Sequence, residues 1–406
     1  MSRHRIADVY KAGVLAARLE RVEHGTRFSY LPAYLAAHRD PVATTLPLSS
    51  RPVETPAGAV PAFFTGLLPE GRRLASLRRA VKTSADDELG LLMAAGGDPV
   101  GDVQIVPHGE PLSSHARDLE HAVEFDARRP PDFAALVDDP TLVDPKALAG
   151  IQDKVSAGMI SLPAAEAGRR YILKLNAPEF PHVVENEYLM YRFAARLRLP
   201  LSPVRLVHDV EGRAGLLVER FDRPVLPEGG NARLAVEDGS QLLGLYPADK
   251  YSVSYEELCR AVASQCAAEL PALRNLALQG AFAWLVGNGD LHAKNVSVVR
   301  GLMVAGEWTV APVYDIPSTV PYGDLSLALP LGGKRTGISR RHFLGWAGAL
   351  GLPPRAAVGG VDAALRAAGP LVAALEADDG GPSPFGATQT RSWVKELRHR
   401  RRLLDG

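Results

Sequence analysis

The feature that most constrains this chain is an apolar run that ends abruptly in a polar segment. The run, Leu276–Val286, has the sequence LALQGAFAWLV. A helix that is apolar on all sides is buried, and the uncharged stretch 276–289 is too short to span a membrane. The polar segment Gly287–Arg300, GNGDLHAKNVSVVR, follows at once and leads into a strand-like run. We therefore expect a core helix that ends in a functional loop.

Within this loop, Asp290 and Asn295 have the D-x-x-x-x-N spacing of phosphotransferase catalytic loops. In such loops the Asp orients the acceptor hydroxyl and takes its proton, while the Asn binds magnesium. Asp315 follows in VYDIPS after a predicted hairpin, which would return it beside Asn295 as a second metal ligand. The alternatives are a capped loop after a helix for Asp290 and Asn295, and an Asx turn before Pro317 for Asp315.

Three lysines and a histidine are candidates for the phosphate-binding groups. His292 and Lys294 lie in the same loop, where either can offset charge on the transferred phosphoryl group. Upstream, Lys174 lies in the alternating strand YILKL, and the next helix places Glu187 on its inward face. A Lys–Glu pair of this kind must be closed for activity in kinases; the alternative is a structural ion pair. Lys154 lies in AGIQDKVSAG, a weak candidate for a phosphate loop.

The run AGLLVERFDRP, residues 214–224, is a buried strand that turns polar, as an interlobe hinge would. Backbone groups near Glu219 and Phe221 would then pair with the adenine edge. The alternative is an ordinary strand end with an ion pair.

The order of predicted elements indicates an α+β chain with a bilobal, protein-kinase-like fold. Residues 1–107 alternate short strands with turns and one predicted helix, Phe63–Arg79, and form a small N-terminal α+β subdomain. Residues 108–140 are rich in Pro, Ser and charge and are a connector. We assign residues 141–235 to a strand-rich N-lobe and residues 236–406 to a helical C-lobe, with ATP in the cleft between them.

The overall composition excludes some function classes. Lys plus Arg and Asp plus Glu both number 46, so no net charge draws the chain to nucleic acid or to an anionic membrane. The two cysteines cannot form a disulfide framework, and the N-terminus has no leader pattern, so we expect a cytoplasmic protein. Four arginines near the C-terminus resemble a nucleic-acid patch, but we favour a final helix whose cations face its negative end and solvent: Arg398, Arg400, Arg401 and Arg402.

Taken together, these segments resemble the HipA family of serine/threonine kinase toxins over nearly the whole chain. In the N-terminal part, PVATTLPLS, AFFTGLLPEG and GDPVGDVQIVP match the family pattern. In the kinase part, AGIQDK, ILKL, ENEY, LVERFDR, NGDLHAKN and YDI match in order.

The resemblance implies an ATP- and Mg²⁺-dependent protein kinase of a bacterial toxin–antitoxin system. Family substrates include aminoacyl-tRNA synthetases, and the usual partner is a small helix-turn-helix antitoxin of HipB type that binds operator DNA, so the toxin touches DNA only indirectly. Some members also carry a serine before the AGxQxK loop that is autophosphorylated. Here Ala147 stands in its place, which puts that form of self-inactivation in doubt.

Two other readings are open. GDLHAKN also resembles the loop of aminoglycoside and choline kinases, so a small-molecule phosphotransferase is the main alternative, although that group needs neither the N-terminal domain nor AGIQDK. A pseudokinase that acts only as a co-repressor is the second alternative. The intact Lys174, Asp290, Asn295 and Asp315 argue against it.

Overall fold

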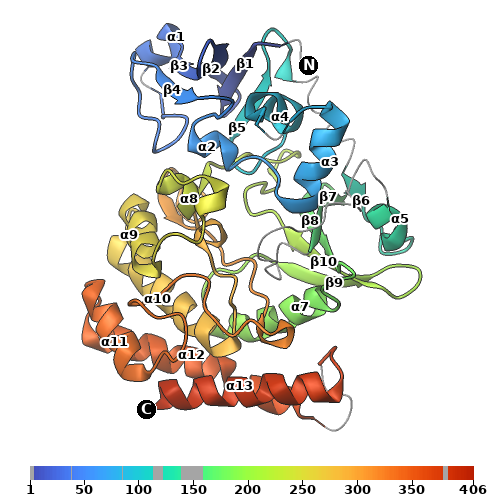
Figure 1. The fold of residues 1–406 in the computed structure, drawn as a ribbon, viewed down its shortest axis with the longest axis vertical. Helices are drawn as coiled ribbons and strands as arrows, with labels where there is room; N and C mark the ends of the chain where they lie inside the picture. Colours follow the sequence, from blue (N-terminus) through green and yellow to red (C-terminus); the bar gives the residue numbers. More distant parts are fainter. Residues whose placement is uncertain (1–3, 38, 85, 113–121, 139–158, 378–382) are drawn as a thin grey trace.

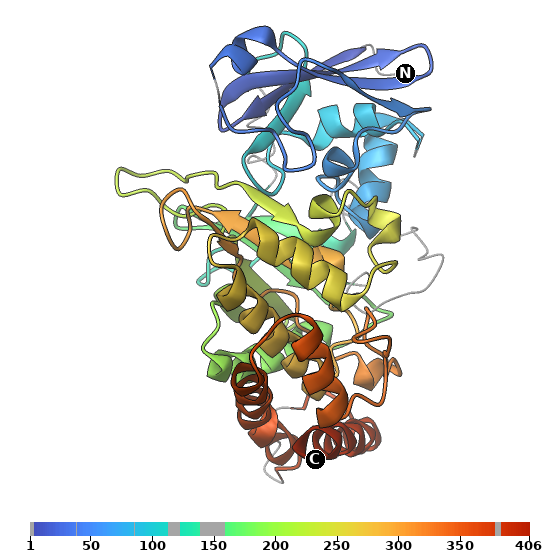
Figure 2. The same cartoon turned by 90° about the vertical axis from the view of Figure 1, so that its left-hand side faces the viewer.

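The computed structural model describes residues 4–37, 39–84, 86–112, 122–138, 159–377 and 383–406. It places an N-terminal sheet at one end of the molecule, a second sheet beside the middle, and a helical unit at the other end (Figure 1). Figure 2 shows the N-terminal sheet lying beyond the second and third sheets, farthest from the C-terminal helices. The mixed helices and strands confirm the predicted α+β class.

The N-terminal sheet is antiparallel with the order β4-β3-β2-β1-β5. Along its strands, buried residues alternate with less buried ones, as in β3. The buried face of the sheet packs on short helices. The strands are β1 (Ile6–Lys11), β2 (Val14–Val22), β3 (Gly25–Tyr30), β4 (Val53–Pro56) and β5 (Val103–Pro107). The helices are α1 (Pro32–Ala36), α2 (Ala62–Thr65), α3 (Gly71–Val81) and α4 (Glu88–Ala95).

The prediction of one helix over Phe63–Arg79 is wrong. The chain leaves helix geometry after α2 and re-enters it at α3, with Glu70 in an extended conformation at the N-cap. Pro69 explains the break, because a proline has no N–H to donate within a helix and restricts the residue before it. The break turns residues 66–70 into a loop that faces the rest of the molecule.

The second sheet has the order β6-β7-β8-β10-β9 and is antiparallel except for the β6–β7 pair. Part of the segment predicted as a connector contributes β6 and α5 to it. The strands are β6 (Val123–Glu124), β7 (Ile160–Glu166), β8 (Arg169–Leu175), β9 (Val204–His208) and β10 (Ala214–Glu219). The helices are α5 (Phe133–Asp138) and α7 (Val183–Ala194), and a 3₁₀ turn, η2 (Ala195–Leu197), extends α7.

The C-terminal unit combines helices with a small antiparallel sheet of order β11-β12-β13. The strands are β11 (Val236–Asp238), β12 (Ser297–Arg300) and β13 (Trp308–Val310). The helices are α8 (Gly239–Leu242), α9 (Tyr255–Gln265), α10 (Glu269–Val286), α11 (Arg340–Ala349), α12 (Pro354–Leu375) and α13 (Ala387–Asp405). The 3₁₀ turns are η3 (Pro247–Asp249), η4 (Ala293–Asn295) and η5 (Val320–Tyr322).

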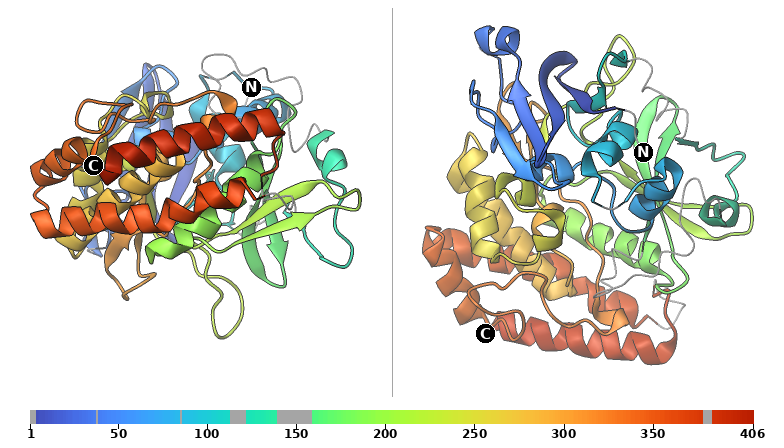
Figure 3. Two further views of the ribbon diagram at one scale, coloured as in Figure 1. Left: turned by 90° about the horizontal axis from the view of Figure 1, so that it is seen from below. Right: turned by 45° about the horizontal axis from the view of Figure 1, so that its top comes forward.

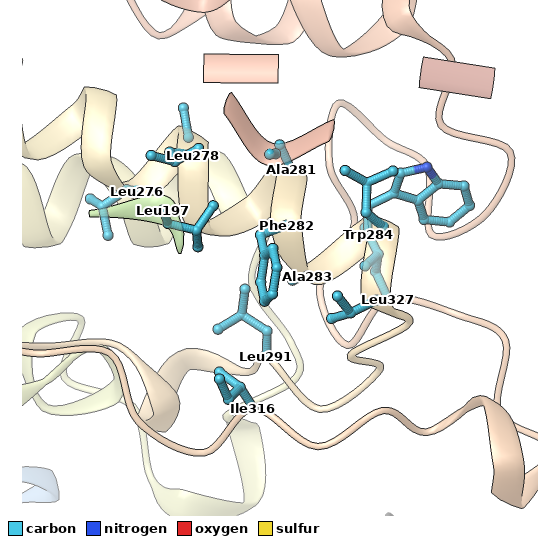
Figure 4. Packing of buried hydrophobic residues seen from close by; sticks show 14 of the residues in the cluster. Leu197, Leu276, Leu278, Ala281, Phe282, Ala283, Trp284, Leu291, Ile316 and Leu327 are labelled. Carbon is cyan, nitrogen blue, oxygen red and sulfur yellow. The ribbon is translucent and has the colours of Figure 1, made fainter. Parts of the chain in front are cut away.

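The largest core surrounds α10, which is buried on all sides as its sequence predicts. Figure 4 shows Phe282 of α10 pointing toward Leu291 and Ile316, which follow the predicted base Asp290 and the predicted metal ligand Asp315. Seen from below, α12 and α13 run side by side under this core (Figure 3). Core packing therefore fixes the backbone next to both Asp290 and Asp315.

By length and composition, α12 is the single helix of the described residues that could cross a membrane, with 22 residues and a mean hydropathy of 1.3. It packs against α10, α11 and α13, and such a composition is also found in core helices.

Candidate active site

The predicted catalytic loop begins where α10 ends, at a glycine that no other residue can easily replace. Gly287 has a φ of +72°, and a Cβ built on it would lie 2.3 Å from Val320 Cγ2. Positive φ is unfavourable for residues with a Cβ, so glycine ends the helix here at little cost. The turn places the predicted base Asp290 directly beyond the buried helix end.

Asp290 is fully buried, and hydrogen bonds hold its backbone and its carboxylate. Its N–H donates to Asn288 Oδ1 at 2.9 Å, and the Tyr251 hydroxyl donates to its Oδ1 at 3.3 Å. Asn295 donates from Nδ2 to the Asp290 carbonyl at 2.8 Å. This last bond ties the two ends of the D-x-x-x-x-N motif together and leaves the Asn295 side-chain oxygen as a potential ligand.

The predicted hairpin is present and brings the Asp315 segment back to the loop. β12 and β13 pair antiparallel, and the Tyr314 hydroxyl donates to the Lys294 carbonyl at 2.7 Å. Asp315 follows with a φ of +58°, a strained conformation for a non-glycine residue. Such strain persists where the surroundings over-determine it, often at functional sites.

Lys174, Glu187 and Asp315 form a compact group that we call the Lys174 cluster. Lys174 Nζ donates to both Glu187 carboxylate oxygens at 2.9 Å and to Asp315 Oδ1 at 2.8 Å. The predicted Lys–Glu ion pair is therefore present. Glu187 is on the buried face of α7, as its spacing with Met190 and Ala194 predicts. The cluster joins β8 and α7 of the second sheet to the Asp315 segment of the helical unit.

The protonation states in this cluster follow from burial and mutual attraction. Burial would lower the pKa of Lys174, but the two carboxylates outweigh it and raise that pKa, so Lys174 stays charged. Burial raises the pKa of Glu187 to about 7 despite Lys174. Burial alone would raise the pKa of Asp315, yet Lys174 holds it below its usual value. Asp315 is thus the carboxylate kept ionised.

The donor set fits magnesium better than a transition metal. Among the described residues, no three His, Cys, Asp or Glu side chains gather as a metal site. Asn295 and Asp315 offer an amide oxygen and a carboxylate, the hard ligands that Mg²⁺ takes together with substrate phosphates and water. Asp315 already binds one cation group, Lys174 Nζ, which shows that its surroundings favour a positive charge.

His292 and Lys294 lie in the same loop but in different electrostatic states. Burial, with a further contribution from Lys250, lowers the pKa of His292 to about 3, so its ring is neutral at pH 7. The ring packs edge-on against Tyr251 at 5.1 Å between centroids. Lys294 pairs with Glu70, which outweighs burial and raises the pKa of Lys294.

The structure gives less information on the residues predicted to contact adenine and on those of the predicted phosphate loop. The Glu219 N–H donates to the Pro203 carbonyl at 2.9 Å, and its carboxylate pairs with Arg169 at 2.7 Å. The Phe221 ring packs against Tyr314, with centroids 5.9 Å apart, so the segment after β10 contacts the segment that carries Asp315. Lys154 and Ala147 lie outside the described residues.

The sequence analysis did not predict the contacts of Glu70 and placed one arginine wrongly. Glu70 contacts Lys250 and Lys294, and only the AFFTGLLPEG match pointed to its segment. The expectation that the C-terminal arginines face solvent is wrong for Arg400. It is fully buried, with its guanidinium carbon 4.3 Å from the Trp284 ring centroid, and it donates to the carbonyls of Trp284 and Leu325. Arg400 thus supports the end of α10, just before the catalytic loop.

Comparisons with known proteins agree with this geometry. Residues 7–106 match the HipA N-terminal domain, and residues 146–369 match the HipA-like C-terminal domain. A protein of Sinorhizobium fredii that is provisionally named a kinase is 31% identical, with 84% of each chain covered. The serine/threonine-protein kinase toxin HipA of Shewanella oneidensis is 27% identical over 72% of this chain and 70% of its own.

Among solved structures, HipA of Shewanella oneidensis MR-1, in a complex with HipB and operator DNA, has the same fold. The TM-score is 0.79 at 22% sequence identity, with 98% of this chain and 97% of that chain covered. Two domain matches in the expected order, together with the curated relative, decide the family. This chain belongs to the HipA family of kinases.

Proposed function

We propose that this chain is an ATP- and Mg²⁺-dependent serine/threonine protein kinase that acts as the toxin of a toxin–antitoxin module. The observation that carries the proposal is the Lys174 cluster, in which Lys174 contacts both Glu187 and Asp315. A closed Lys–Glu pair beside a metal-binding Asp is the arrangement that kinases need for phosphoryl transfer. A protein without this activity would have little reason to bury such a costly set of charges.

Each predicted residue has a role in this proposal. Asp290 accepts the proton of the acceptor hydroxyl, and Tyr251 orients its carboxylate. Asn295 and Asp315 hold Mg²⁺, which when bound neutralises charge on the phosphates. Further residues hold the nucleotide: Lys154, Lys174, His292 and Lys294 at its phosphates, with Glu187 fixing Lys174, and the backbone near Glu219 and Phe221 at adenine.

The neutral state of His292 decides what that side chain can do. A neutral imidazole donates one hydrogen bond and accepts another, so it adds no charge to the phosphate site. Its Nδ1 is buried without a hydrogen-bond partner among the described residues. A buried polar atom without a partner is costly, so a ligand that satisfies it would gain affinity.

The proposed partners follow from the family. The Shewanella HipA was solved with HipB and operator DNA, and we extend to this chain a small helix-turn-helix antitoxin of that type. Equal numbers of acidic and basic residues suit a toxin that reaches DNA only through its antitoxin. We propose a cytoplasmic protein substrate, of which an aminoacyl-tRNA synthetase is the example that the family suggests.

The second candidate function is a small-molecule phosphotransferase, which the GDLHAKN loop favours. The N-terminal domain argues against it, because the Thr44 hydroxyl and N–H donate to Glu237 and the Phe63 carbonyl accepts from Gln241. Enzymes of that group need no domain docked in this way onto the start of the helical lobe.

Transfer of labelled γ-phosphate from ATP, with Mg²⁺ and a host lysate as acceptor, tests the proposal. We expect a labelled protein band with the wild type and a loss of at least about a hundredfold with Asp290→Asn, because the proton acceptor is gone. Asp249→Asn is the matched control, since it makes the same change at an exposed carboxylate. Label on small molecules alone would favour the second candidate.

A further inference from the structure

The loop that interrupts the predicted helix carries a carboxylate into the active site. Glu70 Oε1 lies 2.5 Å from Lys294 Nζ, and its Oε2 lies 2.6 Å from Lys250 Nζ. We call these three residues the Glu70 cluster. Glu70 belongs to the N-terminal domain, whereas both lysines belong to the kinase part of the chain. One carboxylate therefore bridges two ammonium groups across a domain boundary.

Both lysines are joined to the catalytic machinery. Lys294 is next to Asn295 in the catalytic loop, and the Lys250 carbonyl accepts a hydrogen bond from Ala293 N at 3.2 Å. Lys250 Nζ also lies 5.4 Å from the ring centroid of Tyr251, whose hydroxyl contacts the catalytic Asp290. Both lysines are thus joined to the loop that carries Asp290 and Asn295.

The bridge leaves both lysines able to bind a further anion. Lys294 Nζ donates to Glu70 and to the Gly66 carbonyl, and Lys250 Nζ donates to Glu70. An ammonium group has more N–H donors than either lysine uses on the described residues. Within the Glu70 cluster, one carboxylate neutralises only one of the two ammonium charges, so the cluster itself keeps one positive charge for a phosphate group, while Asp238 also attracts Lys294.

Several contacts hold the loop of residues 66–70, which carries Glu70, in one position. The loop is therefore not a mobile segment that must open for a ligand to bind. A Cβ on Gly66 would lie 2.9 Å from Gln241 Cγ, so the loop backbone packs closely on α8. Gln241 Nε2 donates to the Phe63 carbonyl at 3.0 Å. On the other side of the loop, Arg72 pairs with Glu179 of the second sheet's connection at 2.7 Å.

We propose that Glu70 is a positioning residue that holds Lys250 and Lys294 as a paired site for the terminal phosphates of ATP. The inference rests on the proposed phosphotransfer function and deepens it, because it makes the N-terminal domain part of the phosphate site and assigns Lys250 a ligand. A fixed carboxylate pre-orders two flexible side chains, which lowers the entropy lost when the phosphate binds. Without Glu70, the two ammonium groups repel each other and move apart.

The test compares the binding of ATP and of AMP, both with Mg²⁺, to Glu70→Gln and to the wild type. We expect Glu70→Gln to weaken ATP binding about fivefold to tenfold and to leave AMP binding unchanged, because only ATP reaches the paired lysines. Glu70→Asp keeps the charge and should recover most of the ATP affinity. Arg72→Gln is the matched control, since it loosens the same loop without touching either lysine.

Each outcome decides the proposal. Tighter ATP binding by Glu70→Gln would show that Glu70 competes with the phosphate, and equal weakening by Arg72→Gln would show a docking role only; either result overturns it. A wild type that does not distinguish ATP from AMP also overturns it. A wild type that binds ATP tightly but transfers no phosphate would refute the proposed function alone. The positioning role would then still be tested by the ratio of the ATP affinities of Glu70→Gln and the wild type.

Discussion

The Lys174 cluster and the Glu70 cluster have opposite compositions. In the first, one ammonium group lies between two carboxylates; in the second, one carboxylate lies between two ammonium groups. Their exposure differs as well: the Glu187 side chain is fully buried, whereas the Glu70 side chain is 40% exposed. The first is internal to the kinase part, and the second crosses to the N-terminal domain.

The opposite charge excess suits the two parts of one ligand. The spare carboxylate of the Lys174 cluster attracts a metal cation, and the spare ammonium of the Glu70 cluster attracts a phosphate. Magnesium ATP carries both charges at a short separation. The comparison also separates two kinds of stabilisation, since buried ion pairs are costly to break and exposed pairs contribute little.

The largest expected difference is in stability. Lys174→Met leaves two carboxylates buried without their cation, and we expect a loss of about 3–5 kcal/mol in the free energy of unfolding. Lys294→Met is the matched variant in the other cluster, and its loss should stay within about 1 kcal/mol, because Glu70 can turn to solvent. Urea unfolding of both variants checks this. Equal losses would break the distinction between the clusters.

The two clusters also differ in how far the sequence predicts them. The partners Lys174 and Glu187 are 13 residues apart, on a strand and the helix that follows it, so alternation and helical spacing suffice to pair them. Glu70 is 224 residues from Lys294, and no local pattern carries that contact. The error over Phe63–Arg79 added to this, because a continuous helix would have hidden Glu70 within it.

The same contrast holds for the rest of the site. The motif around Asp290 and the hairpin to Asp315 are local, and the structure has the hairpin where the sequence predicts it. Arg400 was misplaced because its partners, the carbonyls of Trp284 and Leu325, belong to the ends of distant segments. An arginine can be buried where backbone carbonyls accept its hydrogen bonds, and the composition of a sequence does not show where such carbonyls lie.

A smaller effect concerns His292, whose pKa depends on residues of both clusters. Its pKa of about 3 is set first by burial, with Lys250 and Lys294 lowering it and Glu70 and Asp315 raising it. The unfolded chain binds a proton near pH 6.5 and the folded chain does not, so stability is present above that pH and is lost as the pH falls toward 3. At pH 5 this loss is about 2 kcal/mol relative to pH 7.

His292→Gln should remove this part of the pH dependence, as followed by urea unfolding at pH 7 and pH 5. His24→Gln is the control, since that side chain is exposed at the turn between β2 and β3. If His292→Gln and the wild type lose stability in parallel, the imidazole is accessible to water in the folded chain, and residues of the two clusters do not set its pKa.

The smallest effect is a salt dependence that only one cluster should show. Glu70→Gln removes a partly exposed bridge, so its cost in the free energy of unfolding should be at most about 1 kcal/mol at low salt. Raising the ionic strength to about 0.5 M should abolish that cost, because exposed charges are screened, while the cost of Lys174→Met should hardly change. Arg72→Gln, at another exposed interdomain pair, should behave like Glu70→Gln. A large, salt-independent cost for Glu70→Gln would instead mean that the Glu70 cluster holds the domains together as a buried pair does.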